Sequence, residues 1–395
     1  MLAEIKKLSK QFFPEVVGHR RHLHANPELS FEEYKTSAYV KGVLDDIGLP
    51  WKAVAKTGVE AVIQGKLPSG QVIALRADMD ALPITEASNV SYVSRNPGVM
   101  HACGHDFHTS SLLGVARILH HLSDRFGGTV KLLFQPGEEV LPGGASIMIK
   151  EGVLKDPFVS SVIGQHAMPR LEVGQIGIRT GKHMASMDSI IVRVIGKGGH
   201  GGEPHQNIDP VVIASHIIIA LQQIVSRMAH PGEPTVLSFG KVIANGAINV
   251  IPDEVYMEGT FRAMNETWRS EAHGRMTKMA ESIAEGMGGK CEFKIIRGYP
   301  FLVNAERLTA HVRRWSEEYL GKEHVLDEEI WMAAEDFAYY SQVADSCFYL
   351  CGVGNRSKGV TSSLHTPTFD IDENALEVST GLMTYLAIMR LNSKD

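Results

Sequence analysis

Side chains that bind metals are concentrated in residues 100–109, which hold three histidines, a cysteine and an aspartate. Imidazole and thiolate groups at this density are typical ligands of a transition metal such as zinc. A polar loop would also explain these residues, with its histidines capping the next helix and Cys103 buried as a small apolar side chain. The stretch alone leaves both interpretations open.

More acidic and histidine side chains follow segments that predict sheet strands. Strands at 72–75, 129–134 and 161–164 lead, in this order, to Asp78 and Asp80, to Glu138 and Glu139, and to His166. Open α/β sheets place their sites at the carboxyl ends of strands, so we expect these side chains to converge. A solvated acidic turn would also explain Glu138 and Glu139.

Five side chains of ligand type lie in predicted loops or at strand ends: Cys103, His105, Glu139, His166 and His365. Five ligands exceed the four of a closed structural zinc site, and they indicate two metals with open positions for water. The mixed sulfur, nitrogen and oxygen set suits Zn²⁺, with Mn²⁺, Co²⁺ or Ni²⁺ as alternatives. Glu138, next to a ligand, is a natural general base.

The elements that must position these groups alternate between strand and helix, which predicts an α/β layer structure in residues 1–182 and 297–395. A helix is expected over residues 3–25, with its histidines and arginines on a polar face. Ser30 and Glu33 have the spacing of a capping box, which predicts that a second helix starts there and ends at Gly48.

Residues 183–296 follow a different pattern. Their predicted order of strands and helices is βαββαβ, the ferredoxin-like arrangement of an antiparallel sheet with two helices on one face. We therefore expect this α+β segment to be a second domain inserted into the first.

Length and composition restrict the class of protein. A chain of 395 residues predicts two domains, and a net charge of −6 argues against a nucleic-acid partner. Four cysteines are too few for a disulfide scaffold and favour a reducing compartment. The amino terminus lacks the pattern of a signal peptide, and the longest apolar run, near 211–221, is too short to span a bilayer. We expect a cytoplasmic protein with no membrane partner.

Five motifs in the same order resemble the M20 metallopeptidase family, and its amidohydrolase branch in particular. They are DMDALP at 78–83, HACGHD at 101–106, PGEE at 136–139, GGHGGEPH at 198–205 and SLHT at 363–366. The branch includes hippurate hydrolases, N-acyl-amino-acid deacylases and auxin-conjugate hydrolases. The resemblance covers essentially the whole chain and implies a zinc-exopeptidase-like catalytic domain with an inserted ferredoxin-like lid and dimerisation domain.

The resemblance also implies roles for single residues. The five side chains of ligand type match the family's metal ligands, Glu138 matches its general base, and Asp80 matches the carboxylate that supports the metal site. The more familiar M20 peptidases carry histidine where this sequence has Asp78 and bridge their metals with an aspartate, a role that falls here to Cys103. The number and identity of the metals therefore stay open.

Three residues of the inserted segment match positions that contact the substrate. His200 matches a histidine that polarises the scissile carbonyl, often from a partner subunit, which implies a homodimer or a tetramer. Asn249 and Arg262 match binding positions, and an arginine fork suits the α-carboxylate of an N-acyl amino acid. Hydrogen bonds to backbone would also explain His200, and an acidic neighbour would also explain Arg262. Glu335 and Asp336 are interpreted as helix caps outside the site.

These features predict metal-dependent hydrolysis of N-acyl amino acids, with water activated by the metals and deprotonated by Glu138. A dipeptidase or carboxypeptidase of the same family is the nearest alternative. A catalytically silent binding protein is disfavoured because the full set of ligand-type residues is present. A structural zinc protein is disfavoured because these residues are scattered over the chain.

Overall fold

Two sheets organise the chain, and each belongs to its own compact unit. The computed structural model describes residues 1–393. The first unit comprises Met1–His183, Val303–Glu329 and the chain from Asp336 onward, and the second comprises Met184–Leu302 and Ile330–Glu335. The short return of residues 330–335 to the second unit was not indicated by the sequence pattern.

An eight-stranded sheet forms the centre of the first unit, in the order β1-β2-β4-β3-β5-β16-β6-β15. Its strands are β1 Trp51–Val54, β2 Gly58–Gln64, β3 Leu67–Asp78, β4 Gly127–Gln135, β5 Ser161–Glu172, β6 Ile176–Ile178, β15 Val325–Asp327 and β16 Asp345–Gly354. The four central strands β4, β3, β5 and β16 run parallel to their neighbours in this group. The predicted α/β fold is confirmed.

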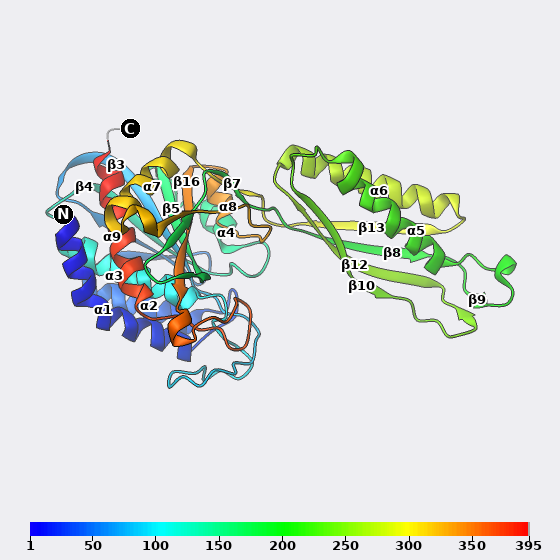
Figure 1. The fold of residues 1–395 in the computed structure, drawn as a ribbon, viewed down its shortest axis with the longest axis horizontal. Helices are drawn as coiled ribbons and strands as arrows, with labels where there is room; N and C mark the ends of the chain where they lie inside the picture. The colour runs from blue at the N-terminus through cyan, green and yellow to red at the C-terminus, as the bar shows by residue number, and fades with distance from the viewer. Residues whose placement is uncertain (394–395) are drawn as a thin grey trace. The chain divides into compact units, whose positions relative to one another are not determined.

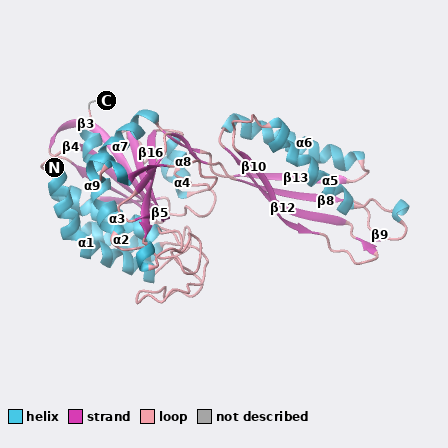
Figure 2. Ribbon diagram, in the orientation of Figure 1, coloured by secondary structure: helices cyan, strands magenta, loops and turns pink. Residues whose placement is uncertain are grey.

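Helices flank this sheet (Figure 1 and Figure 2). They are α1 Leu2–Ala25, α2 Tyr34–Ile47, α3 His105–His121, α4 Gly144–Lys150, α7 Glu306–Leu320, α8 Ala338–Ser341 and α9 Ala375–Asn392. Helices α1, α3 and α9 pack against one another. The polar face expected on α1 is confirmed, because Arg20 and His24 both bind the Asp106 carboxylate, at 2.8 Å each.

Three local predictions differ from the structure. Helix α2 begins at Tyr34, and the side chain of its N-cap residue Glu33 makes no capping hydrogen bond, so the predicted capping box at Ser30 and Glu33 is wrong, whereas its end at the left-handed Gly48 is confirmed. Strand β5 continues to Glu172, so His166 lies inside a strand and not after its end. Helix α8 begins at Ala338 with Phe337 at its cap, so Asp336 does not cap it.

The second unit contains a four-stranded antiparallel sheet in the order β10-β12-β8-β13. Its strands are β8 Asp188–Ile195, β10 Thr235–Ile243, β12 Glu254–Ala263 and β13 Lys290–Arg297, and its helices are α5 Pro210–Gln223 and α6 Glu266–Gly286. Numbered within the unit, the strand order is 4-1-3-2, the predicted ferredoxin-like arrangement. Apolar side chains of both helices share one core with the sheet.

The short remaining elements are β7 Gly181–Met184, β9 Gly199–His200, β11 Val250–Ile251, β14 Leu302–Asn304, and helical turns at Pro204–Gln206, Ile224–Met228, Lys322–His324 and Arg356–Lys358. The turn at Ile224–Met228 continues α5, and together they form an apolar segment of 19 residues. This segment is longer than the sequence indicated, and by length and composition it could cross a membrane. Its residues Ile213, Ile217 and Leu221 are buried in the core of the second unit.

Candidate metal centre and active site

The five predicted ligand residues gather in the first unit as two sets that share Cys103. One set is Cys103, His105 and His166, the other is Cys103, Glu139 and His365, and in each the ligand atoms lie within 4.8 Å of one another. The Cys103 Sγ atom lies 3.4 Å from His166 Nε2 and 3.2 Å from His365 Nε2. A thiolate at this position could contact a metal in each set.

A tight turn brings Cys103 and His105 together at the start of α3. Gly104 caps the helix with φ 90°, a left-handed conformation that favours glycine. A Cβ atom on Gly104 would lie 2.8 Å from the Cβ of Ala167, so the residue also has no room for a side chain. The close approach of α3 to β5 thereby places His105 beside His166.

A hydrogen bond fixes the tautomer that His105 adopts as a neutral ring. Its Nδ1 lies 3.1 Å from Asp80 Oδ1, and because a carboxylate only accepts, Nδ1 carries a proton, so that Nε2 holds the lone pair once the ring is neutral. Both His105 Nε2 and Glu139 Oε1 are buried without a hydrogen-bond partner among the described residues, and they lie 3.9 Å apart. Such atoms are costly to bury unless a further group binds them, and a divalent metal ion would do so.

His166 is oriented by its own backbone and by His108. The Nδ1 of His166 donates to the Ala167 carbonyl oxygen at 2.7 Å, which leaves its Nε2 facing Cys103. The Ala167 N–H donates to His108 Nε2 at 2.7 Å, while His108 Nδ1 donates to Asp78 at 2.5 Å. His108 and Asp78 therefore support the strand that carries His166.

Neighbouring carboxylates raise the pKa values of both Cys103 and His105. Burial raises the pKa of the Cys103 thiol, and the charges of Glu139 and Glu138 raise it further. Burial alone would lower the pKa of His105, but the Asp78 and Asp80 carboxylates outweigh it and raise that pKa to about 10. The metal-free site therefore favours protons on both groups, and binding of a cation would release them.

Glu138 is held by a residue that the sequence analysis excluded. The backbone N–H of Asp336 donates to Glu138 Oε1 at 3.3 Å. The Asp336 carboxylate accepts hydrogen bonds from Arg76 Nη2 at 2.7 Å, from Gln135 Nε2 at 2.7 and 2.8 Å, and from the Ala145 N–H at 2.9 Å. Asp336 thus belongs to the site, although no sequence pattern links it to residues about 200 positions away.

The three predicted substrate-contact residues lie in the second unit. His200 is exposed on β9, and its Nδ1 accepts a hydrogen bond from the Gly202 N–H at 3.0 Å. Asn249 lies nearby, since its carbonyl oxygen accepts from the Gly201 N–H at 2.8 Å. The Nη1 of Arg262, on β12, is buried without a hydrogen-bond partner among the described residues.

Known proteins share both the sequence and the fold. An N-acyl-L-amino acid amidohydrolase of Geobacillus stearothermophilus is 46% identical over 302 residues, which are 76% of this chain and 81% of the relative. An N-acetyl-L-cysteine deacetylase of Bacillus subtilis is 41% identical, over 92% of this chain and 85% of the relative.

A crystal structure from Bacillus subtilis, described as a dinuclear metal-binding peptidase from the M20 family, is 36% identical and superposes with a TM-score of 0.83, covering 97% of this chain and 99% of that one. The sequence model of peptidase family M20/M25/M40 matches residues 74–388. The chain belongs to this family.

Proposed function

We propose that this protein hydrolyses the amide bond of N-acyl amino acids at a site that holds two divalent metal ions. The observation that carries the proposal is the pair of ligand sets that share Cys103, with Glu138 beside them. Cys103, His105 and His166 would hold one ion, and Cys103, Glu139 and His365 the other. Zn²⁺ suits this donor set best, and Mn²⁺, Co²⁺ or Ni²⁺ would also fit. The names of the relatives support this substrate class.

Each step of amide hydrolysis would fall to a different group of the site. The ions, when bound, supply a Lewis acid that polarises the substrate carbonyl and acidifies water. Glu138 takes a proton from the attacking water and passes it to the nitrogen of the leaving amine. The Asp336 N–H holds Glu138, and Asp80 fixes the tautomer of His105. His200 would stabilise the oxyanion of the tetrahedral intermediate.

Arg262 would bind the α-carboxylate of the substrate, with Asn249 as a further contact. Asp188 lies close enough for its charge to act on Arg262, but the Nη1 atom of Arg262 has no hydrogen-bond partner among the described residues, which favours an anionic ligand at that atom. Substitution Arg262→Gln should raise KM by about tenfold or more with little change in kcat. The exposed Arg193, which binds Glu254, offers the matched control Arg193→Gln.

The second unit would serve as the lid and as the interface of a homodimer or tetramer. Ile219 on α5 is 71% exposed, and Val211 and Val212 are also exposed. Strand β10 lies at an edge of its sheet, so it offers free backbone groups beside this apolar helix. Analytical ultracentrifugation of Ile219→Glu should show a monomer, and an unchanged assembly would contradict this interface.

A substrate panel tests the function itself. N-acetyl, N-benzoyl and N-succinyl amino acids are assayed with Zn²⁺, Mn²⁺, Co²⁺ and Ni²⁺, and dipeptides serve as the competing class. We expect hydrolysis of acylated single amino acids that a chelator abolishes and a metal restores. Preference for dipeptides would favour the peptidase alternative, and inactivity on every substrate would favour a binding protein.

We also propose a cytoplasmic location, which would keep Cys103 reduced.

A further inference from the structure

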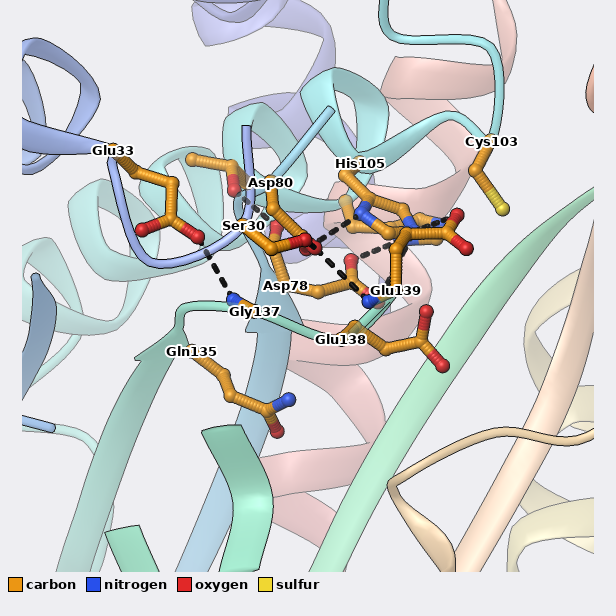
Figure 3. Close-up of polar contacts among 12 residues, drawn as sticks. Ser30, Glu33, Asp78, Asp80, Cys103, His105, Gln135, Gly137, Glu138 and Glu139 are labelled. Carbon is orange, nitrogen blue, oxygen red and sulfur yellow. Dashed lines mark hydrogen bonds and ion pairs between the residues drawn. The ribbon is translucent and has the colours of Figure 1, made fainter. Parts of the chain in front are cut away.

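Ser30 and Glu33, which do not cap helix α2, point instead toward the residues of the site (Figure 3). The Ser30 hydroxyl donates to Asp80 Oδ2 at 2.6 Å. The buried Glu33 carboxylate accepts the backbone N–H of Gly137 at 2.8 Å. The short loop that holds Ser30 and Glu33 therefore contacts the segments that follow two different strands, β3 and β4.

Glu33 fixes the loop that delivers Glu138 and Glu139. Besides Gly137, its carboxylate accepts the Phe31 N–H at 2.9 Å and the Thr57 hydroxyl at 2.5 Å. Gly137 directly precedes Glu138 and adopts φ 58°, which favours glycine. A Cβ atom on Gly137 would lie 2.4 Å from the Phe31 ring, so the ring packs directly on this backbone. The hydrogen bond from Gly137 to Glu33 and the packing of the Phe31 ring thus join this loop to the turn.

Ser30 acts on the same carboxylate pair through Asp80. The Oδ2 atom of Asp80 accepts both the Ser30 hydroxyl and the Glu139 N–H, the latter at 3.0 Å. Its Oδ1 accepts from His105 Nδ1. Because the Ser30 hydroxyl sets the plane of the Asp80 carboxylate, it affects both the His105 ring and the backbone of Glu139.

We propose that Ser30 and Glu33 are positioning residues of the hydrolytic site. Glu33 fixes the conformation of the turn that carries the general base Glu138 and the ligand Glu139. Ser30 fixes the orientation of the Asp80 carboxylate, which in turn orients the ligand His105. Neither residue touches the ligand atoms. The inference rests on the proposed function for the roles of Glu138, Glu139 and His105. It adds that two residues of the α1–α2 loop, Ser30 and Glu33, hold these groups in position.

Glu28 in the same loop provides a matched control. Its carboxylate also accepts three hydrogen bonds, from the N–H groups of Lys35 and Thr36 and from the Thr36 hydroxyl, all at the start of α2. Substitution Glu28→Ala therefore removes a similar set of bonds without touching the site. Substitution Glu33→Gln keeps one acceptor oxygen for the N–H groups of Gly137 and Phe31. It removes the charge and replaces the acceptor of the Thr57 hydroxyl with an NH2 group, to which that hydroxyl can turn its oxygen.

Two measurements test the positioning roles of Ser30 and Glu33. The first is the affinity of the metal-free protein for Zn²⁺, by competition with a chelating dye, and the second is kcat and KM for N-acetyl amino acids. We expect Glu33→Ala to weaken Zn²⁺ binding about tenfold and to lower kcat by about 10–100-fold, with KM changed less than about threefold. Glu33→Gln should restore both to within about threefold of wild type. Equal values for Glu33→Ala and Glu28→Ala would overturn the proposal.

Ser30→Ala keeps the test decisive if Glu33→Ala does not fold, because it removes a single oxygen atom. It should weaken Zn²⁺ binding about tenfold, and wild-type affinity in this variant would refute the role of Ser30. A wild-type protein that binds Zn²⁺ but hydrolyses no N-acyl amino acid would refute the proposed function instead. The Zn²⁺ affinities of the variants would still decide whether Ser30 and Glu33 position the ligands.

Discussion

Asp336 should be among the most sensitive positions of the first unit. Arg76 is fully buried, and its guanidinium binds Asp78 Oδ2 and Asp336 Oδ1 at 2.7 Å each. Substitution Asp336→Ala would leave Arg76 with one of these two carboxylates. It would also take an acceptor from Gln135 and from the Ala145 N–H. Loss of one partner from a buried ion pair costs about 3–5 kcal/mol, so we expect the free energy of unfolding to fall by this amount.

Urea titrations followed by circular dichroism measure this change. Asp327, whose side chain is 92% exposed and binds Arg313, provides the control, since removal of an exposed ion pair costs about 0.5 kcal/mol. Asp336→Asn should retain more stability than Asp336→Ala because it keeps the shape and an acceptor oxygen. If Asp336→Ala were within about 1 kcal/mol of Asp327→Ala, Asp336 would not be needed to neutralise Arg76.

Two further predictions concern the shared ligand and the second unit. Cys103→Ala should lower the metal content per chain, measured by mass spectrometry of the metals, because Cys103 belongs to both ligand sets; the buried Cys347→Ala should not. Burial alone would raise the pKa of Asp188, but hydrogen bonds from Arg269 and His273 outweigh it and lower that pKa to about 2 from an ordinary 3.8. This folded value lies below the unfolded one, so the stabilisation of at most about 2 kcal/mol is present above pH 4 and lost as the pH falls toward 2. Other buried carboxylates also lose stabilisation as the pH falls, so urea titrations across this range should show a smaller loss in Asp188→Asn than in wild type, by at most about 2 kcal/mol.

Ligand-type residues could be predicted from the sequence because their chemistry is visible in the residue type. Cys103 and His105 stand two positions apart, and Glu139 follows a strand whose apolar pattern is clear. The structure brings these side chains together as expected. His166 was also recognised, although β5 extends beyond it because pairing with β16 continues past that residue.

The supporting residues could not be predicted because their partners are distant in the chain. Ser30 and Glu33 have the spacing of a helix cap, and local rules assign them that role. Tertiary contacts override these rules, since Ser30 binds a residue 50 positions away and Glu33 one 104 positions away. Asp336 likewise resembled a cap, and only the structure shows that it is buried and bound to Arg76.

Turnover by the Glu138→Ala variant tests the central claim most directly. The variant is loaded with Zn²⁺, its metal content is confirmed to equal that of wild type, and hydrolysis of the best N-acyl amino acid is measured. A carboxylate oxygen of Glu138 lies within 4.8 Å of ligand atoms of His105 and Glu139, but Glu138 is not in either set that shares Cys103. If Glu138 acts as the base and those two sets hold the metal, the metal should stay and kcat should fall by about 10²–10⁴-fold. Hydrolysis at the wild-type rate would contradict the assignment of Glu138 as the general base and the proposed mechanism with it.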